Sequence, residues 1–171
     1  MSVIEKEIIA TVLSQEEYKQ VRFLEPKYFT DTMNQKIWQL ILKFKGDTLE
    51  MVARLEATER HHWMNVVANG CLGTWSTNIS QMGLKLVEMR FERFFIILIT
   101  DLIGKSQSMV EKSLLSEIRQ VVGDKDIFDL SDSALDYLGD HSSDMVKKRI
   151  NDFIEYRNKR IGKIKELTNG N

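Results

Sequence analysis

The sequence predicts an all-α protein. Apolar residues recur at helical spacing along almost all of the 171 residues, alternation of β-branched residues is rare, and the chain holds a single proline. Hydrophobic residues make up 43% of the chain and charged residues 29%, a balance typical of a globular fold rather than of disorder. The length fits one domain of ordinary size, or one domain with an extension.

Charge and cysteine content narrow the classes of function. The net charge of −1 provides no overall field that would favour nucleic acid or acidic lipid. The single cysteine, Cys71, cannot form an internal disulfide and fits a reducing compartment. Since no apolar run approaches the roughly 18 residues of a membrane helix, and the first residues lack a signal-peptide pattern, we expect a cytoplasmic protein without membrane contact.

Residues 1–78 are predicted to form a compact helical head. Ser14 and Glu17 have the spacing of a capping box, and Glu25-Pro26 stops the helix that follows, because a residue before proline avoids the α region. Thr30 or Asp31 is expected to cap the next helix. The head helices are predicted at residues 3–13, about 15–23, from Met33 to Phe44 with Gly46 as the stop, 48–56 and 58–69.

Residues 79–130 are predicted to form a long helical hairpin. Its first helix runs from Ile79 to Gly104, about 25 residues against a mean of about 11–12 in globular proteins. The second half of this helix is apolar on almost every side, so it must be covered on several faces. A polar turn at 105–108 then leads to a second amphipathic helix.

Residues 131–171 are predicted to form a linker segment. A brief helical piece at 131–139 precedes a helix from about Asp144 to Leu167, with Ser142 or Ser143 as its cap. The apolar stripe of this helix is narrow, and it carries eight Lys or Arg against four Asp or Glu between Asp144 and Glu166. We therefore expect it to lie on another surface instead of inside a core.

A set of apolar positions at fixed distances resembles one family. Leu24, Pro26 and Phe29, then Asn34, Ile37 and Trp38, resemble the signature turn and following helix of the N-terminal domain of DnaB-type replicative DNA helicases, where a histidine is common at the place of Asn34. The stretch Glu5 to Leu13 is similar to the first helix of that domain. The start of the family hairpin is resembled by Glu88, Arg90, Phe91, Arg93, Phe94 and Phe95. The end of that hairpin is resembled by Ile127 to Leu130.

The resemblance implies a non-catalytic assembly and interaction domain. In the family, these domains pair through their hairpins, and three dimers close a hexameric collar above the motor ring. The collar contacts primase or the helicase loader, and the linker helix packs on the motor domain of a neighbouring subunit. The family continues into a RecA-like ATPase that this sequence lacks. Two readings therefore stay open: the collar domain of a helicase, or a free-standing phage or plasmid accessory that binds a helicase in trans as loader or inhibitor.

Residues for two kinds of contact follow from these arguments. A dimer seam would bury the surplus apolar surface of the hairpin, with the alternative that the head covers it. Self-association is predicted at Phe91, Phe94, Phe95, Leu98, Leu102, Leu114 and Ile118. Partner docking is predicted at Trp75, since tryptophan is enriched in binding hot spots, and on the linker helix at Ile150, Ile154, Arg157 and Ile161.

Motifs for other chemistry are incomplete. Gly104-Lys105-Ser106 has Ile99 where a phosphate-binding loop needs glycine. His61 and His62 are adjacent, so on a helix they point about 100° apart and do not chelate one metal together. The segment from Ala134 to Gly139 misses the glycine spacing of a helix-turn-helix, and the aspartates in and around it would face phosphate poorly: Asp132, Asp136, Asp140 and Asp144. We expect no catalytic, cofactor or metal site, and at most weak contact with nucleic acid.

Overall fold

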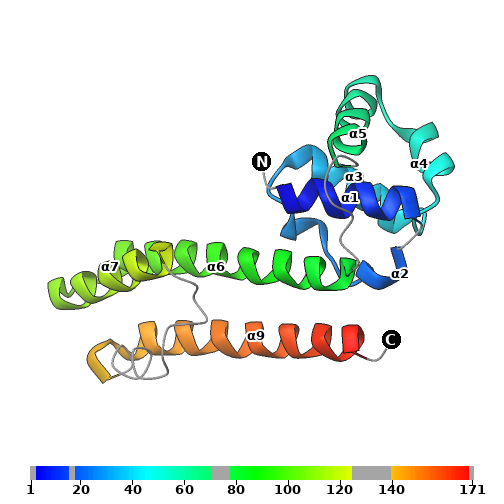
Figure 1. The fold of residues 1–171 in the computed structure, drawn as a ribbon. Coiled ribbons are helices and arrows are strands. Elements are labelled where there is room, and N and C mark those ends of the chain that lie inside the picture. Colours follow the sequence, from blue (N-terminus) through cyan, green and yellow to red (C-terminus); the bar gives the residue numbers. More distant parts are fainter. Residues whose placement is uncertain (1–2, 16–17, 71–77, 125–139, 170–171) are drawn as a thin grey trace. The chain divides into compact units, whose positions relative to one another are not determined.

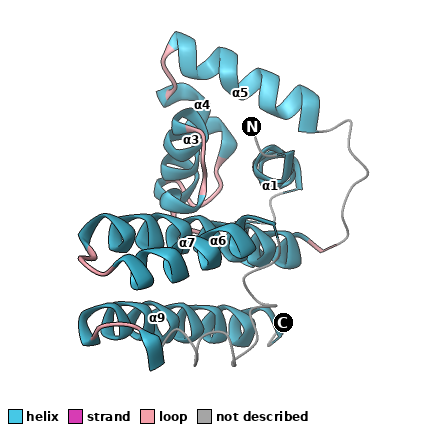
Figure 2. Ribbon diagram, turned by 90° about the vertical axis from the view of Figure 1, so that its left-hand side faces the viewer, coloured by secondary structure: helices cyan, strands magenta, loops and turns pink. Residues whose placement is uncertain are grey.

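The protein is seen in a computed structural model that describes residues 3–15, 18–70, 78–124 and 140–169. This part of the chain contains helices, turns and loops but no strand, which confirms the all-α prediction (Figure 2). The elements are α1 (Val3–Gln15), α2 (Tyr18–Val21), the 3-10 turn η1 (Pro26–Tyr28), α3 (Thr32–Lys43), α4 (Thr48–Arg54), α5 (Ala57–Gly70), α6 (Ile79–Lys105), α7 (Met109–Asp124) and α9 (Asp144–Asn169).

The chain divides into two compact units. Unit 1 comprises Met1–Val87 together with Ile164–Asn171, and unit 2 comprises Glu88–Lys163. The long helices α6 and α9 therefore each contribute to both units. These boundaries differ from the three predicted segments, which ended at residues 78 and 130.

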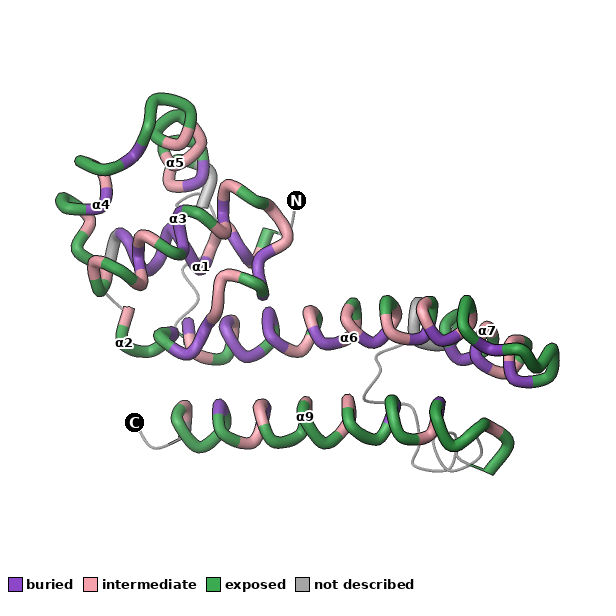
Figure 3. Tube along the Cα trace, turned by 180° about the vertical axis from the view of Figure 1, so that it is seen from behind, coloured by how far each residue is buried: buried purple, intermediate pink, exposed green. Residues whose placement is uncertain are grey.

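Unit 1 is built on α1, α3 and α5. Helix α1 packs against α5 and α3, and α3 also contacts α4 and η1. The buried faces appear purple in Figure 3, and they supply side chains such as Ile8 and Ile9 from α1, Ile37 from α3 and Val66 from α5. Helix α6 enters this unit closely, because a methyl group at Gly83 would meet the Phe23 ring at 2.9 Å.

The turn that carries the family resemblance forms part of this core. Proline at the start of η1 has its φ preset for a tight turn. Phe29 and Trp38 are fully buried, and their ring centroids lie 5.0 Å apart. The Trp38 indole Nε1 donates a 2.9 Å hydrogen bond to the Leu24 carbonyl oxygen, which ties α3 to the chain before η1.

Helix α3 has well-formed ends. Of the two predicted caps, Asp31 is the one used, and its carboxylate accepts hydrogen bonds from the Met33 and Asn34 amides at 2.8 and 3.3 Å. At the other end the Gly46 amide donates to the Ile41 carbonyl at 2.9 Å. Both Lys45 and Gly46 have positive φ, at 53° and 84°. The predicted stop at Gly46 is therefore confirmed, although Lys45 shares the left-handed conformation.

Unit 2 is a three-helix assembly of α6, α7 and α9. The predicted hairpin is present, with α6 and α7 joined by the turn at 106–108 (Figure 1). Helix α9 lies along the hairpin and runs antiparallel to α6. One apolar cluster joins the three helices, and its fully buried members include Ile99, Leu102, Leu115, Val146 and Ile150. The predicted hairpin end at 127–130 and the helical piece at 131–139 lie outside the described residues.

Within the described part of the chain, no helix combines the length and the apolar character needed to cross a bilayer.

Candidate functional site

A buried carboxylate organises the head. Glu5 on α1 is fully buried, and its Oε1 accepts hydrogen bonds from the Thr30 amide at 2.7 Å and the Thr30 hydroxyl at 2.6 Å. Its Oε2 accepts from Asn34 Nδ2 at 3.0 Å. The Asn34 Oδ1 lies 2.9 Å from His62 Nε2 on α5. Because the amide nitrogen of Asn34 faces the carboxylate, its oxygen faces His62, which must carry a proton on Nε2 to complete the chain. Hydrogen bonds thus connect α1, α3 and α5.

A second buried carboxylate fastens α9 to the hairpin. Glu111, in the first turn of α7, accepts a hydrogen bond from the Ser106 hydroxyl in the hairpin turn, and a 2.7 Å bond from the Ser143 amide just before α9. These bonds, the one from Ser106 above all, hold the pKa of Glu111 below its ordinary value of 4.5, although burial acts in the opposite direction. We call this contact the Glu111 latch.

Aromatic packing joins α9 to α6 within unit 2. The Phe95 and Phe153 ring centroids lie 5.3 Å apart, and Phe91 lies 5.8 Å from Tyr156 in an edge-to-face arrangement. An ion pair adds to this contact, with Arg149 Nη2 3.6 Å from Asp101 Oδ2. The α9 side of unit 2 is therefore filled by side chains of the same chain.

The opposite face of α6 is open and largely polar. Ile97 is 64% exposed at its centre, with exposed Arg93 and Thr100 beside it. Gly104 continues this face, and no heavy atom outside its own helix lies within 4 Å of the place where its Cβ would stand. Met89, four residues before Arg93, is also exposed on α6, and two such apolar side chains offer little area to a partner.

The predicted self-association residues divide by burial. Phe94, Leu98 and Leu114 are half-buried. The others are buried in unit 2: Phe91, Phe95, Leu102 and Ile118.

At two of the buried positions the hairpin is covered differently from the prediction. Phe91 and Phe95 were expected to need a second copy for cover, or else the head. The structure shows that α9 covers both, through Phe153 and Tyr156. These two rings are unavailable to another molecule while α9 stays in place. Self-association itself stays a prediction.

The predicted docking residues on α9 require a similar correction. Ile150 and Ile161 are 3% and 7% exposed, so neither is free to dock on a separate protein in this arrangement. Ile154 and Arg157 are half-buried. The narrow stripe does lie on another surface, as expected, but that surface belongs to the same chain. Trp75 lies outside the described residues.

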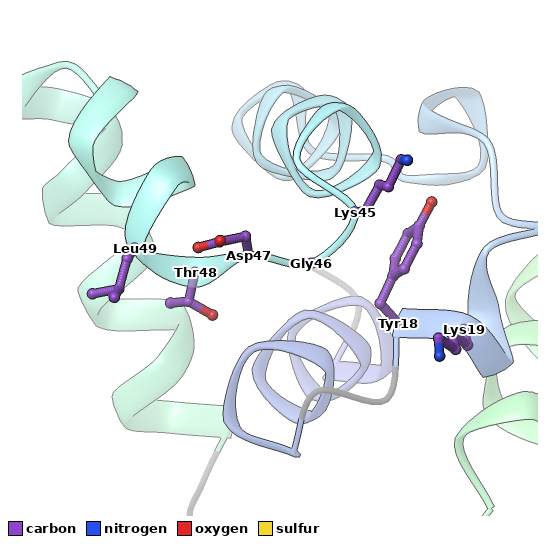
Figure 4. Close-up of a pocket in the computed structure, with 7 residues that line it drawn as sticks. All are labelled: Tyr18, Lys19, Lys45, Gly46, Asp47, Thr48 and Leu49. Carbon is purple, nitrogen blue, oxygen red and sulfur yellow. The ribbon is translucent and has the colours of Figure 1, made fainter.

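Each unit has a pocket large enough for a small ligand. One of about 540 Å³ lies in unit 1 and is lined by Tyr18, Lys19 and the stretch from Lys45 to Leu49. Figure 4 shows the Tyr18 ring pointing towards Lys45, while Leu49 points away from both. The other, of about 380 Å³, lies beside the Glu111 latch. Among the residues that the structure describes, no three His, Cys, Asp or Glu side chains are grouped to hold a metal.

Neither carboxylate network was predicted from the sequence. Glu5 and Asn34 entered only as positions of resemblance, and His62 only as a metal candidate. Glu111 was not singled out at all. A polar residue at a helical position otherwise occupied by apolar side chains was the available signal for Glu5, which lies one turn before the buried Ile8 and Ile9. For Glu111 a local signal was available, since Ser108 and Glu111 have the spacing of a capping box, and the Glu111 amide donates to the Ser108 hydroxyl oxygen at 3.3 Å. The bond from Ser143, far along the chain, has no such signal.

The comparisons with known proteins add no relative. No family model, no curated protein and no solved structure matches this chain. The resemblance to the DnaB-type domain therefore stays a prediction that rests on the residues named above.

Proposed function

We propose that this protein is a non-catalytic assembly and interaction module of a replicative DNA helicase, of the kind that forms the N-terminal collar. It acts in DNA replication in the cytoplasm and contacts primase or the helicase loader. One observation carries the proposal. The residues of the resemblance that lie in the head form one structural unit, since Leu24, Phe29 and Trp38 are buried together and Asn34 is joined to Glu5.

The order of elements also supports this proposal. A head of short helices is followed by a long hairpin and then by a long amphipathic helix. The resemblance implies this order. In the family the last helix connects the collar to the motor, so the proposal includes a motor domain elsewhere, in the same gene or on a separate protein.

A second candidate is a free-standing accessory that binds an intact helicase in trans. The packing of α9 favours this candidate, because its apolar stripe is satisfied within unit 2 by residues such as Phe95 and Leu102. A linker helix that waits for a motor domain would leave that stripe available. The accessory would present its outer surface to the helicase as loader or inhibitor.

The test adds the purified chain to a reconstituted DnaB-type helicase with its primase and loader. We expect a change in helicase loading, unwinding or primer synthesis, and no ATP turnover by the chain alone. A head variant, Trp38→Ala, should lose the effect, whereas the exposed Leu49→Ala serves as a matched surface control. The proposal fails if the chain changes none of the three activities at concentrations above those of the helicase.

A further inference from the structure

The pocket of unit 1 combines positive charge with a flat ring. Its volume of about 540 Å³ lies within the range of about 300–1,000 Å³ that is usual for small-molecule sites. Tyr18 and Lys19 of α2 line it together with Lys45, which follows α3. Tyr18 is half-buried, and its ring points towards Lys45 (Figure 4). No motif marks these residues in the sequence, since only the fold brings α2 to the end of α3.

The charges of the pocket favour an anion. Within the described part of the chain, no side chain forms an ion pair with Lys19 or Lys45. Of the described residues that line the pocket, one is acidic, Asp47, and its carboxylate accepts a 3.1 Å hydrogen bond from the Glu50 amide. That carboxylate is turned towards α4 and away from Lys45 (Figure 4). Two lysines against one aspartate give this lining a net charge of +1.

Lys45 has a backbone conformation that a lysine rarely adopts. Its φ is 53°, in the left-handed region where a residue with a Cβ is less stable than glycine. Its neighbour Gly46, with a φ of 84°, is the residue type that such a position favours. Residues in these conformations cluster at ligand sites, where their side chains are needed despite the strain. The lysine at position 45 is therefore better explained by what its ammonium group binds than by the stability of the turn.

We propose that this pocket binds a nucleoside phosphate. The ammonium groups of Lys19 and Lys45 bind the phosphate oxygens, and the base stacks on the ring of Tyr18. An inorganic phosphate alone would fill only a small part of the volume of about 540 Å³, whereas a sugar and a base occupy the space beside the ring. The proposal adds a ligand site to the head, and it does not rest on the proposed function.

The test measures the binding of ADP, inorganic phosphate and adenosine to the full chain by isothermal titration calorimetry. We expect ADP to bind with a dissociation constant below about 1 mM, and more tightly than the other two, because it alone engages both the lysines and the ring. High salt should weaken this binding, since it screens exposed charges. If ADP does not bind, or if phosphate or adenosine binds as tightly as ADP, the inference is overturned.

The variant Lys45→Gly separates binding from stability. Glycine adopts the left-handed conformation without strain, so this chain should unfold at a higher temperature and yet bind ADP about tenfold more weakly or worse. Lys43→Ala is the matched control, because the Lys43 ammonium lies 5.4 Å from the centre of the Phe44 ring and Lys43 does not line the pocket. It removes the same charge and should leave ADP binding unchanged. A folded Lys45→Gly chain with the natural affinity overturns the inference.

Two further variants test the α2 side of the pocket. Lys19→Gln, at an exposed position, should weaken ADP binding about tenfold with no change in folding. Tyr18→Leu keeps an apolar side chain against Gly46 and should weaken the binding of ADP but not that of phosphate. If neither variant changes the affinity for ADP, this pocket is not the nucleotide site and the inference is wrong.

These outcomes are independent of the helicase assay. A chain that binds ADP in this pocket but has no effect on any helicase would keep the site and remove the proposed function. A chain that alters helicase loading but does not bind ADP would do the reverse.

Discussion

At the scale of single residues, two buried carboxylates hold together helices that are distant in sequence. Glu5 has three hydrogen-bond donors within 3.0 Å and no exposed surface. The donors around such a buried acceptor depend on it, because each donor left without a partner costs about 1–3 kcal/mol. Neither network is visible in full from the sequence, since Thr30, Asn34 and Ser143 meet their carboxylates only through the fold.

Replacing Glu5 tests the head network. We expect Glu5→Ala to lower the free energy of unfolding by about 3 kcal/mol, because Thr30 and Asn34 lose their acceptor. Urea denaturation measures this change, with Glu7→Ala, a half-buried glutamate on the same helix, as the control. Glu5→Gln should also change the imidazole nitrogen spectrum of His62 by forcing Asn34 to rotate. An unchanged His62 spectrum in a folded Glu5→Gln chain would contradict the hydrogen-bond chain from Glu5 through Asn34 to His62.

The Glu111 latch predicts a dependence on pH. The folded pKa of Glu111 lies below its ordinary value of 4.5, so its stabilising contribution is present above that pH and is lost as the pH falls through the folded pKa. We expect the attachment of α9 to weaken below pH 4.5, as measured by amide hydrogen exchange in α9. Glu111→Gln should weaken it already at neutral pH and remove this part of the acid dependence. An equal acid response in both chains would count against the latch.

The end of α3 requires a glycine at one position. Gly46 has a φ of 84°, and a Cβ there would lie 2.8 Å from Tyr18 Cβ. We expect Gly46→Ala to cost about 2 kcal/mol in thermal or urea unfolding, since strain and a close contact add together. Gly104→Ala is the matched control, because it lies in α6 with open space around it and should stabilise by up to about 1 kcal/mol.

At the scale of the elements, spacing predicted most helices because each buries a regular apolar face. The ends were predictable where a capping side chain or a glycine acts locally, as Asp31 and Gly46 do for α3. The cover of α6 was not predictable. Periodicity shows that Phe91 and Phe95 must be buried, but a second copy, the head and α9 are equal candidates until long-range packing is known. The sequence therefore predicted that these rings need cover but not that α9 provides it, and contact with a second copy stays a prediction.

The two faces of α6 should respond differently to substitution. Phe95 is 2% exposed and contacts Phe153, so Phe95→Ala should cost about 3–5 kcal/mol and release α9. Ile97→Ala, on the open face, should cost less than about 0.5 kcal/mol. Chemical denaturation with hydrogen exchange reports both effects. If Ile97→Ala were the more damaging change, the outer face of α6 would be an interface after all.

At the scale of the whole molecule, the chain has two compact units and two helices that belong to both. Composition predicted a globular protein, and the helical pattern predicted its class. The division at residues 87 and 164 was not predictable, because α6 and α9 continue across it without a break in their apolar pattern. Each unit nevertheless has its own buried set of side chains.

A substitution in the core of one unit should therefore first destabilise that unit alone. Trp38→Ala removes the largest buried side chain of unit 1 and should cost about 3–5 kcal/mol there. We expect hydrogen exchange to accelerate first in α1, α3 and α5, while α7 stays protected. Simultaneous loss of protection in α7 would show that the two units unfold as one.

The cover that α9 gives to α6 has a consequence during synthesis on the ribosome. Phe153 is translated roughly 60 residues after Phe91 and Phe95, an interval on the order of 3–12 seconds at about 5–20 residues per second. For that time the nascent polypeptide presents uncovered aromatic rings on a helix that is already long enough to form. A chaperone that recognises such rings would find its binding site here, and its release would have to coincide with the emergence of α9.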